Sequence, residues 1–176
     1  MILTIGHSTR PLDELISLLQ ANAVALLMDV RTVPRSRRHP QFNRDELSKS
    51  IPANGIAYRH LPGLGGLRKP SDDSMNTAWR NESFRGYADY MQTPEFEGAI
   101  QELITTGGHR QCAIMCAEAV PWRCHRSLVA DALTARGVTV EHIIGPGARR
   151  PHEMTPFAAV DGSRVTYPGA QLTLGG

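Results

Sequence analysis

Short apolar runs alternate with amphipathic segments along this chain, and this alternation constrains the fold more than any other feature. The runs are strand-like in length and are bounded by Gly, Pro or polar residues. They lie at residues 2–5, 24–30, 56–61, 112–116 and 138–144. Segments with helical spacing lie between them, at residues 11–19, 43–51, 84–91, 94–106 and 124–136. The pattern predicts an α/β fold: an open, mostly parallel five-stranded sheet flanked by helices, with a Rossmann-like architecture.

Turn and cap residues refine this prediction. Ser8 or Thr9 is expected to cap the first helix, and Asn43 or Asp45 the second. The pattern changes after Gly145-Pro146-Gly147. There, Asp161-Gly162 between two short apolar runs predicts a small hairpin with a type I′ turn. We therefore expect an α/β domain over residues 1–145 and a C-terminal extension over residues 146–176, with the hairpin packed on the domain.

Composition narrows the class of protein. The net charge of +2 gives no bulk argument for nucleic acid, although four arginines fall within residues 31–38. Three cysteines, an odd number, favour reduced thiols over a disulfide framework. The first residues lack the features of a signal peptide, and no apolar run approaches the roughly 20 residues of a membrane span. We expect a cytoplasmic protein with no membrane partner; the oligomeric state stays open.

Residues 116–126 hold the densest collection of reactive side chains. This stretch follows the fourth apolar run and contains Cys116, Glu118, Arg123, Cys124, His125 and Arg126. Ligands of open α/β sheets bind at the carboxyl ends of the strands, where the strand order reverses. His7, Asp29 with Arg31, and Gly65-Gly66 follow the other runs, so we expect all these groups to meet in one solvent-reachable pocket.

The candidate catalytic residues are Cys116, Glu118 and His7. Cys116 can act as a nucleophile if a neighbouring guanidinium or a helix N-terminus lowers its pKa; the alternative is a buried, inert thiol. Glu118 is the acid–base candidate, with an ion pair to Arg123 or Arg126 as its alternative. His7 is expected in the pocket rather than as a capping or packing residue.

The second thiol leaves several roles open. Cys124 lies near the first turn of the following helix, where the helix dipole favours a thiolate, or it packs beneath the loop. A redox pair with Cys116 is a minor alternative, because the spacing is not Cys-x-x-Cys. A zinc site formed with His125 and His7 is disfavoured, since structural zinc ligands come in closely spaced pairs.

The remaining groups indicate binding of an anion. Guanidinium forks match phosphate oxygens, and glycines let the backbone approach a ligand closely. The candidate binding residues are Arg31, Ser36, Gly65, Gly66, Arg123, Cys124, His125 and Arg126. For Asp29 a structural ion pair with Arg31 is favoured. Neither a Walker A motif nor a Gly-x-Gly-x-x-Gly fingerprint is present, which argues against ATP and dinucleotides, and we expect no cofactor. We also expect no metal, given the cysteine spacing.

These motifs resemble the family catalogued as domain of unknown function 488. The residues that carry the resemblance are Thr4-Ile5-Gly6-His7-Ser8, Asp29-Val30-Arg31 with Pro34 and Ser36, Gln41-Phe42-Asn43, Leu64-Gly65-Gly66, Met115-Cys116-Ala117-Glu118 and Cys124-His125-Arg126. The resemblance covers nearly all of residues 1–144. It implies an α/β domain with a shared site and no settled activity.

Two classes of function remain open. The first is an enzyme that binds an anionic or nucleotide-like small molecule and uses Cys116 or Glu118 for chemistry. The second is a non-catalytic module that binds nucleic acid or nucleotide through the loop from Arg31 to Arg38. We favour the enzyme, because mixed Cys, Glu, His and Arg side chains suit chemistry better than charge capture.

Overall fold

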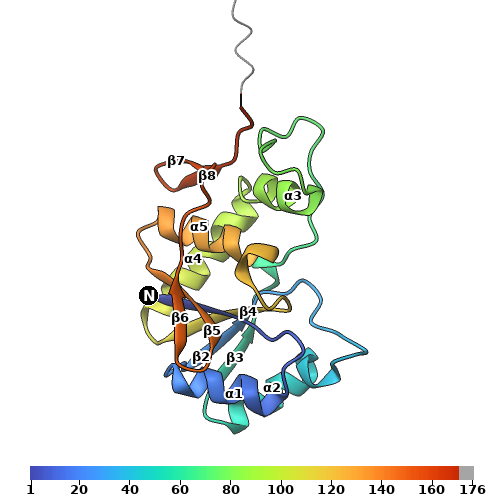
Figure 1. The fold of residues 1–176 in the computed structure, drawn as a ribbon, viewed down its shortest axis with the longest axis vertical. Coiled ribbons are helices and arrows are strands. Elements are labelled where there is room, and N and C mark those ends of the chain that lie inside the picture. Colours follow the sequence, from blue (N-terminus) through green and yellow to red (C-terminus); the bar gives the residue numbers. More distant parts are fainter. Residues whose placement is uncertain (171–176) are drawn as a thin grey trace, which may run out of the picture.

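The computed structural model describes residues 1–170 and has a six-stranded sheet at its centre (Figure 1). The strand order is β3-β2-β4-β1-β5-β6. The strands are β1 (Ile2–Gly6), β2 (Leu26–Asp29), β3 (Ala57–His60), β4 (Cys112–Cys116), β5 (Val140–Gly145) and β6 (Ala148–Pro151). The first five strands are parallel to one another, whereas β6 runs antiparallel to β5. The predicted α/β class is confirmed.

The sheet has one strand more than the five predicted. All four residues of β6 are exposed, and two of them are arginines, so the segment carries no apolar pattern. A tight turn after β5, in which Gly147 has a φ of 64°, brings β6 back along its neighbour. Backbone hydrogen bonds rather than burial hold this strand, which is why sequence patterning misses it.

Helices cover both faces of the sheet (Figure 1). One face carries α1 (Leu12–Ala21) and α2 (Arg44–Ala53). The other face carries α3 (Glu82–Tyr90), α4 (Pro94–Gly108) and α5 (Arg126–Ala135). The buried side chains accordingly form two hydrophobic clusters, one on each face. Three short 3-10 helices, η1 (Pro40–Phe42), η2 (Pro62–Leu64) and η3 (Pro121–Arg123), lie in the loops.

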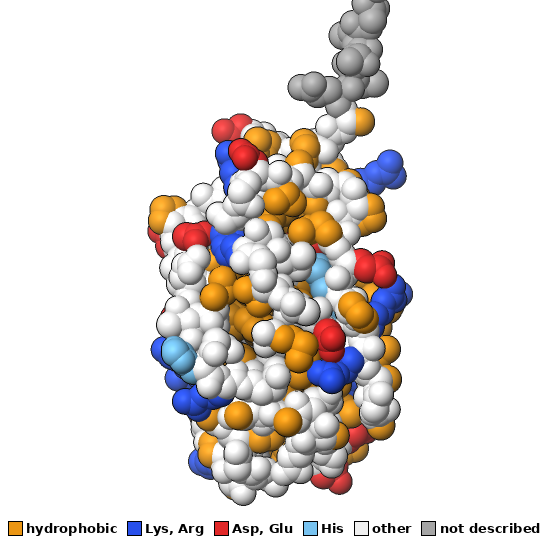
Figure 2. Space-filling view, turned by 90° about the vertical axis from the view of Figure 1, so that its left-hand side faces the viewer, with side chains coloured by type: hydrophobic (Ala, Val, Ile, Leu, Met, Phe, Trp, Pro, Cys, Tyr) orange, Lys and Arg blue, Asp and Glu red, His pale blue; other side chains and the backbone are white. Residues whose placement is uncertain are grey.

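The surface shows no strong segregation of charge on the face that Figure 2 displays. Acidic and basic side chains are interspersed there around hydrophobic ones. This agrees with the small net charge of the chain. None of the helices in residues 1–170 is long and apolar enough to cross a membrane.

The two helix caps differ from their predictions in detail. Neither Ser8 nor Thr9 caps α1; Pro11 occupies that position without a side-chain hydrogen bond. Ser8 is instead held in the loop, where its N–H donates to the carbonyl of Ala117 at 2.9 Å. Asn43 does precede α2, but its Oδ1 accepts from the Ser36 N–H at 2.6 Å. Asn43 therefore anchors the loop of residues 31–38, which we call the arginine loop, rather than the helix.

The predicted hairpin forms from β7 (Ala159–Asp161) and β8 (Arg164–Thr166). Its central turn residues are Gly162 and Ser163, one position later than predicted, and Gly162 alone of the two has a positive φ. A type I′ turn requires positive φ at both positions, so that prediction was wrong. Tyr167 follows β8 and donates to Asp131 Oδ2 in α5 at 2.7 Å, which ties this segment to the domain. Residues 171–176 of the predicted extension lie outside the described residues.

The chain connections after β1 and β4 diverge at the strand ends that carry the site. The two strands are adjacent and parallel, with Gly6 opposite Cys116. The chain leaves β1 for α1 on one face and leaves β4 for α5 on the other (Figure 1). Neighbouring strands whose connections diverge in this way form a topological switch point, and ligands of open α/β sheets bind there.

Candidate active site

The side chain of Cys116 ends β4 inside a polar cluster. Its Sγ lies 2.6 Å from Nη1 of Arg126 and 2.6 Å from Sγ of Cys124. The carbonyl oxygen of Glu118 is 3.8 Å away. Only 1% of Cys116 is exposed, so its sulfur contacts these groups rather than water. We call Cys116, Cys124, His125 and Arg126 the thiol cluster.

The Arg126 side chain is buried without a carboxylate partner among residues 1–170. Besides the sulfur, its guanidinium donates to the carbonyls of Glu118 at 2.6 Å and Ala119 at 2.9 Å. Arg126 is 1% exposed. A buried charge is costly unless it is paired, and carbonyl oxygens supply dipoles rather than a negative charge. Of the groups that contact the Arg126 guanidinium, the Cys116 sulfur is the one that can ionise and supply the negative charge that pairs with it.

The two thiols differ in their acidity. Burial alone would raise the pKa of Cys116, but the hydrogen bond from Cys124 and the positive charge of Arg126 outweigh it and lower the pKa to about 7. Burial and the hydrogen bond to Cys116 raise the pKa of Cys124 well above its usual value. Of the two thiols, Cys116 is therefore the one whose deprotonation the cluster favours.

His125 is neutral and oriented by the backbone of the neighbouring strand. Its Nε2–H donates to the carbonyl of Val30 at 3.2 Å, an assignment that follows from the acceptor. Its Nδ1 then faces Sγ of Cys124 at 3.6 Å as an acceptor. Burial lowers the pKa of His125 to about 4. A β-carbon on Gly66 would lie 3.0 Å from this Nδ1, so the small residue there lets the backbone approach the imidazole.

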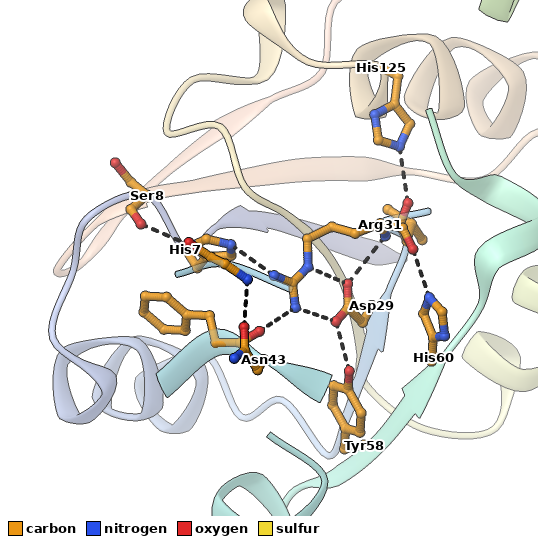
Figure 3. A network of polar contacts seen from close by, with 11 residues as sticks. His7, Ser8, Asp29, Arg31, Asn43, Tyr58, His60 and His125 are labelled. Atoms are coloured by element: carbon orange, nitrogen blue, oxygen red, sulfur yellow. Dashed lines mark hydrogen bonds and ion pairs between the residues drawn. The ribbon is translucent and has the colours of Figure 1, made fainter. Parts of the chain in front are cut away.

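A second buried network lies at the ends of β1 and β2 and centres on Arg31 (Figure 3). Arg31 forms a bidentate ion pair with Asp29, with Nε to Oδ1 at 2.8 Å and Nη2 to Oδ2 at 2.6 Å. Its Nη2 also donates to the carbonyl of Phe42 at 2.7 Å, and Tyr58 donates to Asp29 at 2.7 Å. The predicted ion pair between Asp29 and Arg31 is thus confirmed. The guanidinium N–H groups of Arg31 donate to other groups of the protein.

His7 joins this network as a neutral ring. Its Nδ1–H donates to the carbonyl of Ser8 at 2.9 Å, which leaves Nε2 to accept from Nη1 of Arg31 at 3.2 Å. Burial lowers the pKa of His7 to about 4. The ring stacks on Phe42 with centroids 4.2 Å apart.

The two networks are joined through the backbone. The N–H of His7 donates to the carbonyl of Cys116 at 3.0 Å. On the other side, His125 and His60 donate to the consecutive carbonyls of Val30 and Arg31 (Figure 3). The two networks therefore share backbone hydrogen-bond partners in the segments at the ends of β2 and β4.

The predicted single, solvent-reachable pocket does not form. His7, Arg31 and Cys116 are 4%, 8% and 1% exposed. Glu118 contacts the thiol cluster only through its backbone carbonyl in the hydrogen bonds described above. Glu118 and Arg123 are both exposed residues. Ser36 lies apart, in the arginine loop.

Gly65 and Gly66 pack against the segment after β2 rather than against an open space. A β-carbon on Gly65 would lie 2.4 Å from Oγ1 of Thr32, and Thr32 donates to the carbonyl of Gly66 at 2.7 Å. Sequence reasoning missed Thr32, Tyr58 and His60 as members of the networks. The alternating positions of Tyr58 and His60 in β3 are the one available signal.

No group of three or more His, Cys, Asp or Glu side chains suited to a metal ion occurs within residues 1–170. No curated protein and no solved structure matches this chain. A family model does match: the domain of unknown function DUF488, over residues 11–133. The matched range is shorter than the resemblance seen in the sequence and begins after Thr4–Ser8. Because it spans more than half of the 176 residues, the chain belongs to the DUF488 family.

Proposed function

We propose that this protein is a cysteine-dependent enzyme in which the thiolate of Cys116 reacts with a small molecule. The observation that carries the proposal is the contact between Cys116 and the buried guanidinium of Arg126. A thiolate, not a thiol, is the nucleophile of cysteine enzymes, and an adjacent guanidinium favours it. Its place at the carboxyl end of a central strand, beside the switch point, supports the same conclusion.

The substrate must be small, because Cys116 is almost fully buried. A negatively charged substrate would be favoured by Arg126 within the cluster and by exposed Arg123 on the same loop. A reducing, cytoplasmic location is part of this proposal, since it keeps the thiols free. Glu118 as an acid or base and Arg31 as a substrate ligand remain predictions.

Titration of the thiolate tests this proposal without requiring a reagent to enter the protein. The ultraviolet absorbance of thiolate should rise with a midpoint near pH 7, and this transition should vanish in Cys116→Ser. Cys112, buried in β4, is an internal comparison, because burial raises its pKa to about 12. A wild-type titration that begins only above about pH 8.5, the ordinary thiol value, would overturn the proposal.

The second candidate function is binding of nucleotide or nucleic acid by the arginine loop. Arg35, Arg37 and Arg38 are exposed and form no ion pair within the described part of the chain. A hollow of about 650 Å³ lies beside them, lined by Arg35, Ser36, Arg37 and Asn43 among others. Binding of this kind weakens steeply with salt. It should be lost when Arg35 and Arg37 are both changed to Ala and retained in Cys116→Ser, the reverse of the pattern expected for the enzyme.

A further inference from the structure

A thiolate at Cys116 does not by itself explain why a second cysteine, Cys124, lies in contact with its sulfur. Cys124 comes from the loop before α5, eight positions further along the chain, and its Sγ lies 2.6 Å from that of Cys116. Its backbone N–H donates to the carbonyl of Pro121 at 3.0 Å, which holds the backbone of Cys124 in the loop. A protonated thiol beside a thiolate is the arrangement in which the second sulfur can displace a group from the first.

We propose that Cys116 and Cys124 form a dithiol that reduces a small hydroperoxide and closes to a disulfide. This rests on the thiolate proposed above and adds the substrate class and the role of Cys124. Cys116 is the attacking residue and Cys124 the resolving residue.

The environment assigns the two roles. Arg126 contacts the sulfur of Cys116 through its guanidinium, whereas it contacts Cys124 through its backbone N–H at 3.5 Å. Cys124 also lies beside the imidazole of His125, with its Sγ 3.6 Å from Nδ1. The charge that makes a nucleophile is therefore at Cys116 rather than at Cys124.

Burial selects the substrate class. Cys116 and Cys124 are 1% and 5% exposed, which favours the smallest substrates. A hydroperoxide is small and electrophilic at oxygen, and its oxygens accept hydrogen bonds. Nε of Arg126 is buried and has no acceptor among the described residues, so the guanidinium retains a donor for such an oxygen.

The reaction balances in two steps. The Cys116 thiolate attacks one peroxide oxygen, the O–O bond breaks, and the alkoxide takes a proton from water and leaves as the alcohol. Cys124 then attacks the resulting sulfenic sulfur; an S–S bond forms, the S–O bond breaks, and hydroxide leaves with the Cys124 proton as water. The two thiols are oxidised by two electrons and the hydroperoxide is reduced by two. A dithiol reductant returns the pair to the thiol state.

The position of Arg126 also favours this return. In the disulfide form the guanidinium loses the negative charge beside it and remains buried. Stabilisation of the reduced form makes a disulfide a better oxidant, so it is reduced readily by an external dithiol.

The test exposes the reduced full chain to one equivalent of hydrogen peroxide, followed by alkylation under denaturing conditions and mass spectrometry. Wild type should lose two of its three alkylatable thiols, and peptide mapping should place a disulfide between Cys116 and Cys124. Cys124→Ser should instead accumulate a sulfenic acid at Cys116 that dimedone traps. Cys116→Ser should keep both of its remaining thiols free. Cys112→Ser, the matched control, should still form the disulfide.

The outcomes separate this inference from the proposed function. If Cys116 titrates near pH 7 but peroxide leaves all thiols of the wild type free, or yields only over-oxidised Cys116, the dithiol is wrong and the thiolate stands. If the disulfide maps to Cys112, the assignment is also wrong. The wild-type measurements decide the case even if a serine variant fails to fold. Consumption of peroxide in the presence of dithiothreitol should be lost in Cys116→Ser and retained in Cys112→Ser.

Discussion

Gly6 and the carbonyl oxygen of Glu118 approach so closely that a β-carbon on Gly6 would lie 1.7 Å from that oxygen. The same β-carbon would lie 3.0 Å from Nη1 of Arg126. The end of β1 thus leaves the space in which the loop after β4 folds back over the thiol cluster.

We therefore expect Gly6→Ala to displace the loop and to destabilise the protein by about 1–3 kcal/mol, the usual cost of overpacking. The free energy of unfolding in urea measures this, and the thiolate titration should change with it. Gly98→Ala in α4 is the matched control: nothing lies within 4 Å of its β-carbon, and alanine should stabilise the helix by about 0.5–1 kcal/mol. Equal effects of both substitutions would contradict this account of Gly6.

Substitution of Arg126 separates its charge from its hydrogen bonds. Arg126→Gln removes the positive charge beside Cys116, so the pKa of that thiol should rise above about 7. Thiolate absorbance measured against pH gives the shift. Arg123→Gln, at an exposed position in the same loop, should leave the midpoint in place. A midpoint that stays near 7 in Arg126→Gln would show that another group stabilises the thiolate.

The ion pair between Asp29 and Arg31 should dominate the stability of the second network. Asp29→Asn leaves a buried guanidinium without its counter-charge and should cost about 3–5 kcal/mol. Tyr58→Phe removes one hydrogen bond to the same carboxylate and should cost about 1.5–3 kcal/mol, as bonds to charged groups do. Urea unfolding compares them with Glu102→Gln, which breaks the exposed pair with Arg59 and should cost under about 1 kcal/mol. A similar small loss for Asp29→Asn would mean that the pair is dispensable.

The buried histidines make stability depend on pH in a defined window. Burial lowers the pKa of His7, His125 and His142 from 6.5 to about 4, so between these values the unfolded chain binds protons that the folded protein excludes. Stability should be highest above about pH 6.5 and fall as the pH drops toward 4, by up to about 1.4 kcal/mol per pH unit for each histidine.

Urea unfolding at several pH values measures this slope. His7→Asn should reduce it by the equivalent of about one proton, because the unfolded chain then has one histidine fewer to protonate. His109→Gln, at an exposed position after α4, should leave it nearly unchanged. The interpretation fails if both variants give the wild-type slope.

The sequence predicts the layered fold because burial on both faces of a parallel sheet requires continuous apolar runs, as in residues 112–116. The same logic places His7, Arg31 and Cys116 at strand ends. It does not say which side chains meet there. Cys116 and Cys124 come into contact because the loop between them turns back through η3, and a loop of this kind has no periodic pattern. The absence of Cys-x-x-Cys spacing argued against a pair in the sequence. That spacing describes cysteines within one short turn and does not apply to two cysteines brought together by a longer loop.

The exposed strand β6 also affects how the molecule behaves among its copies. An open sheet edge can pair with a strand of another chain and start aggregation. Here the outermost strand presents Arg149 and Arg150 and ends at Pro151, which has no N–H to donate. Charged side chains and a proline that interrupts any added ladder are features that disfavour pairing with a further strand. The β6 edge of the sheet is therefore poorly suited to self-association.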